Sequence, residues 1–308
     1  MAYINTNNSG DKSLILKQIQ PIVNDHVLNE SEDIDADLTN KINNLKISSP
    51  TTENHIAGEN KTANDDKTNM QKIMDIFDKN VKGKKPDVSG YNKNHKGKEG
   101  HWLEKMMGIE HNSSNSPDIL GYEMKNQTCA KTTFGDWTPD INADGTPVTK
   151  WWTSETQKLE FMKKYGKYNE KKQRWAWANP VKYESYNNYG QRFTITDTGV
   201  FITYNNQKDI YYTTRVTKNE TRGDVLLFGW SHDLLKKRLE NKFGKNGYFI
   251  CKKTNGIYTD IIFYEPILYE KLTDGIKKGR VYLDSGTYQG NARGYMQWRA
   301  NNDWWTNH

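Results

Sequence analysis

The chain has only two cysteines, Cys129 and Cys251, and they lie far apart in its 308 residues. Two isolated thiols give neither a disulfide framework nor a zinc-site spacing, and they are typical of a reducing compartment. No apolar run approaches the length of about 18 residues that spans a bilayer. The first residues also lack the charged and then apolar pattern of a secretory signal. We therefore expect a cytoplasmic protein without a membrane segment.

Three further signatures are missing. The sequence shows no internal repeat, no glycine-rich phosphate loop of the Walker type, and no local motif around a serine or cysteine nucleophile. These absences argue against repeat architectures, P-loop nucleotide hydrolases and the common acyl-transfer enzymes.

Charge is distributed unevenly along the chain. The formal net charge is +6, but residues 1–70 hold 6 Lys against 11 Asp and Glu, a balance of −5, so the other 238 residues carry +11. Ten Trp and eighteen Tyr are interleaved with basic and amide side chains. Such residues bond phosphates and stack on bases, although core packing explains most single rings as well. A basic body with an acidic arm favours a polyanion such as nucleic acid as the partner.

Residues 1–68 predict a polar N-terminal arm that is partly helical or disordered, because residues 48–66 hold little apolar material. The folded body is expected over residues 69–308. Its strands and helices alternate in a way that predicts an α/β body with a mixed sheet. Segments with alternating or continuous apolar residues predict strands at 192–196, 200–204, 209–216, 225–230 and 247–252, with a helix at 232–243 that is basic on its outer face.

Two helices are expected near the start of the body. Met70, Ile73, Met74 and Phe77 form one helical face, and a second apolar stripe lies within residues 97–108. The loop between these helices is rich in Gly and Lys, which suits a phosphate backbone but fits a solvated basic loop equally well.

The segment SPDILGYEMK carries the strongest chemical signal. Residues two apart on a strand share a face, so Glu123 and Lys125 are expected to lie together while Met124 points into a core. If the chain folds back at the intervening glycine, Asp118 meets Glu123. Two carboxylates beside a lysine suit Mg²⁺ and the attack of water on a phosphate. Acid-x-Lys also arises by chance in a chain with 27% charged residues, where it marks a solvated strand face.

Glu104 borders the apolar stripe of the second predicted helix. A carboxylate at that position is usually an ordinary rim residue. Because the acidic segment follows within about twenty residues, the same helix could instead deliver Glu104 to the metal site.

The last loop and strand hold residue types that read bases. Arginine reads guanine through two hydrogen bonds, and Gln or Asn reads adenine. Gln297 and Arg299 share one strand face, and the same side chains also fit an ordinary polar surface. Candidate DNA contacts are Lys96, Lys98, Arg174, Tyr288, Asn291, Arg293, Gln297 and Arg299.

Two linked motifs are carried by Gly97-x-x-Gly100-x-x-Leu103-Glu104-x-x-Met107-Gly108, then Pro117-Asp118 and Glu123-x-Lys125. Together they resemble the MutH-type branch of the PD-(D/E)XK nucleases, and within it the MvaI/BcnI group of type II restriction endonucleases. The resemblance covers roughly residues 95–305. It implies an α/β (α+β) PD-(D/E)XK core, a mixed β-sheet flanked by helices, with a catalytic part at about 69–135 and a DNA-recognition part at about 136–308.

The resemblance also implies residue roles. Asp118 and Glu123 would bind the catalytic Mg²⁺, Glu104 would complete the site, and Lys125 would orient or activate the attacking water. The implied reaction is hydrolysis of a phosphodiester bond in a short duplex DNA site, leaving a 5′-phosphate. The implied setting is a restriction system with a cognate DNA methyltransferase, in which the nuclease acts as a monomer on double-stranded DNA.

The final loop departs from the family pattern, because Tyr288, Gln289, Asn291 and Arg293 stand where the family has histidines. The target sequence is therefore left open. Two other functions fit the same residues: a MutH-like repair nickase that needs an activating partner, and a non-catalytic DNA-binding protein on the same scaffold.

Overall fold

The computed structural model describes residues 67–92, 97–110, 115–128, 130–148, 152 and 154–306. All of them belong to one compact unit that begins at Lys61. Most of the predicted arm and the candidate DNA contact Lys96 lie outside these described residues. Within the described part of the chain, no helix is long and apolar enough to cross a membrane.

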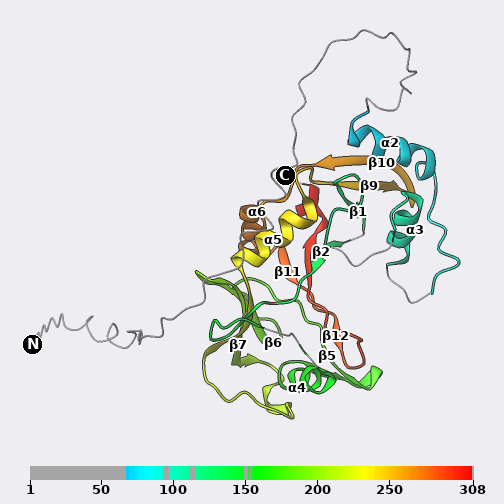
Figure 1. Cartoon of the computed structure of the whole chain (residues 1–308). Helices are drawn as coiled ribbons and strands as arrows, with labels where there is room; N and C mark the ends of the chain where they lie inside the picture. The colour runs from blue at the N-terminus through cyan, green and yellow to red at the C-terminus, as the bar shows by residue number, and fades with distance from the viewer. Residues whose placement is uncertain are drawn as a thin grey trace, which may run out of the picture. The chain divides into compact units, whose positions relative to one another are not determined.

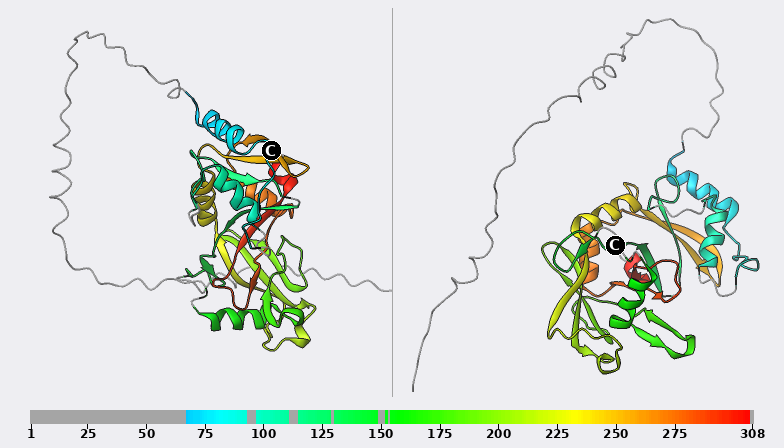
Figure 2. Two further views of the ribbon diagram at one scale, coloured as in Figure 1. Left: turned by 90° about the vertical axis from the view of Figure 1, so that its right-hand side faces the viewer. Right: turned by 60° about the horizontal axis from the view of Figure 1, so that its bottom comes forward.

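The acid–lysine motif lies in a three-stranded sheet that packs against two helices (Figure 1). Strand β1 (Glu123–Asn126) pairs in parallel with β9 (Tyr248–Thr254), and β9 pairs antiparallel with β10 (Ile257–Tyr264). Helices α2 (Asn69–Asn80) and α3 (Lys98–Met106) confirm the two helices expected from the sequence. The further views in Figure 2 also show α2 alongside β10.

A small apolar core joins these elements. Ile73 and Phe77 of α2 are buried against Leu103 of α3, together with Met124 of β1 and Phe249 of β9. Because Met124 enters this core, its neighbours on β1 must face the other way. The alternation that the sequence predicts for this strand is confirmed.

Three further sheets and four helices complete the part of this unit that the structure describes. The four-stranded antiparallel sheet has the order β3 (Ile141–Asn142), β8 (Asp224–Ser231), β7 (Gly199–Asp209), β6 (Tyr189–Ile195). The other two three-stranded sheets have the orders β11 (Val281–Leu283), β13 (Gln297–Asn301), β2 (Lys131–Asp136), and β12 (Thr287–Tyr288), β5 (Arg174–Trp177), β4 (Lys167–Asn169). The helices are α4 (Glu155–Tyr165), α5 (His232–Phe243), α6 (Tyr269–Lys277) and α7 (Asn302–Thr306), with short 3₁₀ turns η1 (Glu170–Lys172) and η2 (Tyr212–Thr214).

Tryptophan dominates the larger core. Trp137, Trp177, Trp230, Trp298 and Trp305 are each at most 1% exposed. Their rings pack edge to face and tilted, as between Trp230 and Trp298 at 5.0 Å. Trp102 and Trp304 are buried as well, so core packing, rather than base stacking, accounts for seven of the ten tryptophans.

One predicted strand is wrong. Residues 209–216 do not form a strand, because β7 ends at Asp209 and the chain turns through η2. The buried Asp209 carboxylate accepts a hydrogen bond from the backbone N–H of Tyr211 and pairs with the buried Arg215. A carboxylate that captures a nearby N–H favours a turn over a ladder.

The sheet that contains β1 combines strands from both sides of residue 135, the position at which the sequence separates the catalytic part from the DNA-recognition part. Strand β1 lies in the part that the sequence assigns to catalysis, yet both other strands of its sheet, β9 and β10, come from the part assigned to DNA recognition. The site around β1 is therefore built from both parts.

Candidate active site

A tight turn brings Asp118 back beside β1. The backbone N–H and C=O groups of Ile119 and Tyr122 bond each other at 3.0 and 2.8 Å. The two central residues, Leu120 and Gly121, have positive φ angles of 47° and 82°. Gly121 adopts this conformation freely, whereas Leu120 adopts it at a cost. The predicted reversal of the chain at this glycine is confirmed.

Asp118 is held against the start of β1. Its Oδ2 atom accepts a hydrogen bond of 2.8 Å from the backbone N–H of Met124. Burial raises the pKa of Asp118 to about 6, and the negative charge of Glu123 contributes in the same direction. The two carboxylates are thus close enough to repel each other, which is the arrangement that a cation relieves.

Glu123 is buried between two lysines. Its side chain is 3% exposed, and its Oε1 atom lies 2.7 Å from Nζ of Lys125 and 2.9 Å from Nζ of Lys242. Its Oε2 atom is buried and has no hydrogen-bond partner among the described residues. A buried carboxylate oxygen without a partner is costly unless a ligand or ion satisfies it.

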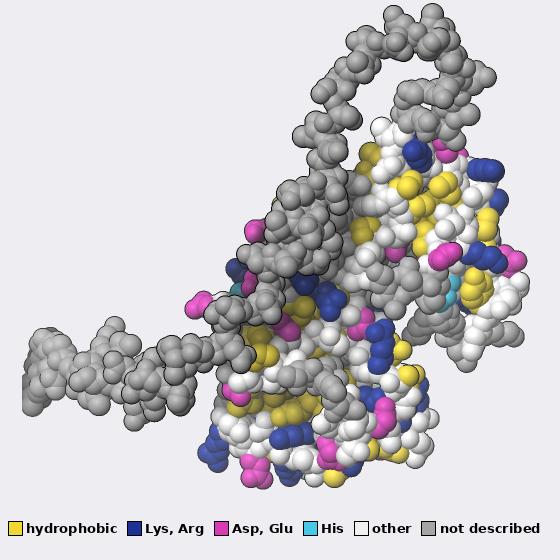
Figure 3. Space-filling view, viewed as in Figure 1, with side chains coloured by type: hydrophobic (Ala, Val, Ile, Leu, Met, Phe, Trp, Pro, Cys, Tyr) yellow, Lys and Arg dark blue, Asp and Glu magenta, His cyan; other side chains and the backbone are white. Residues whose placement is uncertain are grey.

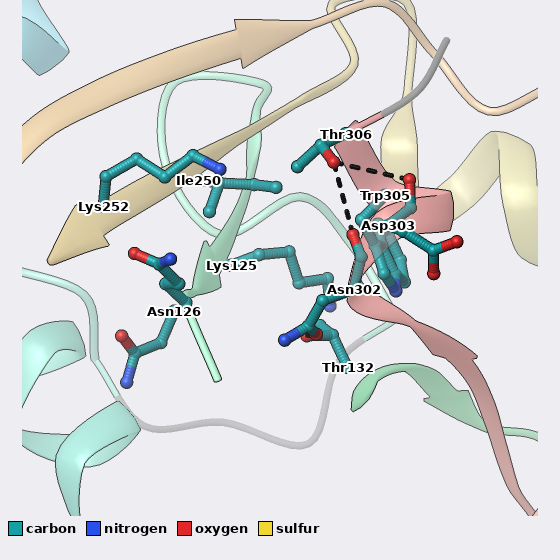
Figure 4. A pocket seen from close by; sticks show the side chains of 10 residues that line it. Lys125, Asn126, Thr132, Ile250, Lys252, Asn302, Asp303, Trp305 and Thr306 are labelled. Carbon is teal, nitrogen blue, oxygen red and sulfur yellow. Dashed lines mark hydrogen bonds between the residues drawn. The ribbon is translucent and has the colours of Figure 1, made fainter. Parts of the chain in front are cut away.

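Lys125 points along the same face of β1 as Glu123, as the spacing predicts. Burial lowers the pKa of Lys125, while the Glu123 charge opposes this shift. The lysine reaches into a pocket of about 180 Å³, lined also by Thr132, Lys252 and Trp305 (Figure 4). The ammonium nitrogen lies 5.6 Å from the centre of the Trp305 ring. Polar side chains and one aromatic wall therefore surround the lysine.

Glu104 occupies a different setting. It is half-buried on α3 and lines a pocket with Tyr91, His101 and Lys105. Within the described part of the chain, no three His, Cys, Asp or Glu side chains gather closely enough to hold a metal ion. The structure therefore does not assemble Glu104 with Asp118 and Glu123, and the role of Glu104 stays a prediction.

Comparison with known proteins decides the family. Residues 81–308 match the family model described as LlaMI restriction endonuclease. The chain belongs to this family. It is 37% identical to the type II restriction enzyme ScrFI of Lactococcus lactis subsp. cremoris, over 77% of this chain and 96% of that protein. The LlaMI family membership and this relative show a type II restriction endonuclease, an enzyme that binds and cleaves DNA.

The fold of this LlaMI-family enzyme also has a solved counterpart. The restriction endonuclease MvaI in complex with its cognate DNA substrate aligns with a TM-score of 0.51 and 16% identity, covering 76% of this chain and 91% of MvaI. The PD-(D/E)XK-like α+β architecture expected from the sequence is confirmed, as is the resemblance to the MvaI group.

The sequence did not single out Lys242, the second lysine on Glu123. It lies in the last turn of α5, a helix predicted to be basic on its outer face. Leu239 and Phe243 of this helix are buried, and Lys242 borders their stripe. Its side chain is 13% exposed, so this base does not face solvent. In the sequence, only the position of Lys242 next to an apolar stripe could have indicated that its side chain is turned inward.

Several of the candidate DNA contacts in this endonuclease hold its final loop in place. The guanidinium of Arg174 lies over the Tyr288 ring at 3.4 Å. Asn291 is buried: its Oδ1 atom accepts from the backbone N–H of Tyr288 at 2.6 Å, and its carbonyl accepts from Lys158. The Asn291 side chain therefore fixes the loop, and a base contact by it stays a prediction.

The two remaining arginine candidates, one on β13 and one in the loop, contact acids. Arg299 donates to Gln297 Oε1, which confirms that these two share a face, and it lies 3.4 Å from Asp284. Arg293 is 66% exposed and pairs with Asp136 at 3.0 Å. Basic and acidic side chains are also interspersed on the face drawn in Figure 3. Ion pairs of this kind hold arginines in place until a stronger anion competes.

Lys98 lies at the start of α3 and is half-buried. Nothing in the structure separates a phosphate contact from an ordinary surface position for this lysine. Its role in DNA binding stays a prediction, as do those of the other candidates.

The raised pKa of Asp118 predicts a dependence of stability on pH in the metal-free protein. The folded protein holds this proton up to about pH 6 and the unfolded chain only to about pH 4, so the Asp118 contribution to stability falls between these values as pH rises. Asparagine carries no titrating proton, so Asp118→Asn removes this pH-dependent loss of stability. We expect the variant to be about 2–3 kcal/mol more stable than the natural protein at pH 7.5, with no difference below about pH 4. Urea unfolding in EDTA at several pH values measures this difference, and a constant difference at all pH values would contradict the prediction.

Proposed function

We propose that the enzyme hydrolyses DNA phosphodiester bonds in a Mg²⁺-dependent reaction at Asp118, Glu123 and Lys125, leaving 5′-phosphates. The observation that carries this proposal is a buried carboxylate with an orphaned oxygen, Glu123, beside the half-buried Asp118 carboxylate and the half-buried Lys125. A purely structural cluster has no need for an unpartnered carboxylate oxygen in such a place.

The residues present fit Mg²⁺. This ion prefers hard oxygen ligands and is commonly held by one or two protein carboxylates, with waters and substrate phosphate oxygens completing its shell. Asp118 and Glu123 supply two carboxylates, so the absence of a third acid in the described cluster is compatible with this ion. When bound, Mg²⁺ supplies positive charge that polarises the phosphate and makes a water a better nucleophile.

The side chains then have separate tasks. Asp118 and Glu123 would hold the ion, and the hydrogen bond from the Met124 N–H keeps the Asp118 carboxylate oriented. Lys125 orients the attacking water or stabilises the charge that grows on the attacked phosphate. The water attacks phosphorus and gives up a proton to solvent, the bond to the 3′ oxygen breaks, and that oxygen takes up a proton from solvent to become a hydroxyl, so the phosphate stays on the 5′ end. The burial of Glu123 and the partial burial of Asp118 and Lys125 strengthen these charge interactions.

We further propose that the substrate is a short double-stranded site, that the enzyme acts on it as a monomer, and that a cognate methyltransferase protects the same site. The membership in a type II restriction family supports the methyltransferase, since a site-specific nuclease endangers its own host DNA.

The test is incubation of the purified full-length protein with unmethylated phage DNA, in Mg²⁺ and in EDTA, followed by sequencing of the fragment ends. We expect discrete fragments in Mg²⁺ alone, every end carrying a 5′-phosphate and one shared short sequence. Cleavage that persists in EDTA would contradict the metal requirement. Salt-sensitive DNA binding without cleavage would favour the partner-dependent nickase.

A further inference from the structure

The roles proposed for Asp118, Glu123 and Lys125 do not account for the contact between Lys242 and Glu123. Lys242 comes from the last turn of α5, far along the chain from β1, and its ammonium lies 2.9 Å from Glu123 Oε1. The ammonium nitrogen of Lys125 lies 2.7 Å from the same oxygen atom. Two cations therefore converge on one carboxylate oxygen, and the other oxygen of that carboxylate has no partner among the described residues.

This asymmetry has a chemical consequence. If Lys125 were the sole partner of Glu123, each movement of Lys125 toward a water or a phosphate would leave a buried carboxylate without its counter-charge, which is costly. With Lys242 in place, Glu123 keeps one ion pair when Lys125 moves. The same ion pair restrains the rotation of the carboxylate and keeps Oε1, rather than Oε2, in contact with the lysines.

We propose that Lys242 is a positioning residue of the nuclease: it holds Glu123 through Oε1, which leaves Oε2 for the metal ion and releases Lys125 for the attacking water. The inference rests on the proposed roles of Glu123 and Lys125. Lys242 itself acts through Glu123.

The helix that carries Lys242 is well anchored. Ser231 caps its start by accepting a hydrogen bond of 3.0 Å from the N–H of Leu234. Leu235, Leu239 and Phe243 are each at most 2% exposed and lock the helix against the core. A charge delivered from such a rigid element is more precisely placed than one from a loop. A lysine in the last turn of a helix also complements the helix dipole. The experiment must distinguish this simpler role of Lys242 from the positioning of Glu123.

The experiment compares Lys242→Met, which keeps the alkyl stem, with Lys242→Arg, which keeps the charge. Lys237→Met is the matched control, because Lys237 is exposed on the same helix. We expect Lys242→Met to lower kcat about 10- to 100-fold with KM for DNA within about twofold, since only positioning is lost. Lys242→Arg is expected to recover most of kcat, and Lys237→Met to equal the natural enzyme.

A second readout does not depend on cleavage. Lys242→Met removes a positive charge beside the two carboxylates, so calorimetric titration of the DNA-free protein with Ca²⁺ should show severalfold tighter binding. Mere structural damage would loosen this binding and lower the unfolding temperature together with kcat. Tighter metal binding at an unchanged unfolding temperature therefore excludes structural damage as the cause of a lower kcat.

The outcomes separate this inference from the proposed function. If Asp118→Asn and Glu123→Gln abolish cleavage but Lys242→Met cuts normally, the role of Lys242 is wrong and the proposed site stands. If Lys242→Met binds Ca²⁺ more weakly and unfolds at a lower temperature, Lys242 is only structural. If Asp118→Asn and Glu123→Gln still cut, the proposed site itself fails.

Discussion

Alanine at Asp118, Glu123 or Lys125 is expected to lower the rate of DNA cleavage by at least about a thousandfold, while DNA binding is retained. Removal of one group that stabilises charge in a transition state commonly costs a hundred- to a thousandfold. Here each loss also disturbs its partners, because Glu123 contacts Lys125 and raises the pKa of Asp118. Single-turnover cleavage and a gel shift in EDTA measure the two quantities separately.

A surface pair of the same chemistry provides the control. Glu160 and Lys163 form an ion pair of 2.9 Å on α4, but their side chains are 53% and 29% exposed. Solvent screens such a pair, so Glu160→Ala should change stability by less than about 1 kcal/mol and leave cleavage intact. If alanine at any two of the three site residues left cleavage normal, the catalytic assignment would be wrong.

The local part of this site could be predicted from sequence because it depends on strand periodicity and one turn. Glu123 and Lys125 share a face for the same reason that Met124 is buried, and the glycine after Leu120 permits the reversal that returns Asp118. These relations span only eight residues. They do not require knowledge of what β1 pairs with.

The distant part could not be predicted, because it depends on tertiary pairing. Strand β1 finds its parallel neighbour in β9, and this pairing brings the end of α5 and its Lys242 to Glu123. A helix described as basic on its outer face gives no sign that one base is turned inward. The same limit applies to Asn291, whose residue type suggests base reading but whose side chain carries a hydrogen bond within its own loop.

Trp305 is the other distant residue of the site, and Trp305→Ala is expected to lower the free energy of unfolding by about 3–5 kcal/mol. Its ring is 1% exposed and packs against Phe134 at 4.5 Å and Tyr248 at 5.4 Å. The Tyr248 hydroxyl also donates a hydrogen bond of 2.7 Å to the Trp305 carbonyl, which ties α7 to β9. Urea unfolding of the variant measures the loss.

The same ring forms a wall of the Lys125 pocket, so its loss should reduce catalysis beyond the loss of stability (Figure 4). Trp305→Phe and Trp230→Phe test this with conservative changes at two fully buried tryptophans, of which only Trp305 lies beside Lys125. Well below the unfolding temperature, we expect kcat per folded molecule to fall severalfold in Trp305→Phe and to stay unchanged in Trp230→Phe, because a smaller ring confines the lysine less well. Equal kcat in the two variants would show that α7 contributes packing alone. A selective loss would mean that the last helix of the chain keeps the catalytic lysine in position.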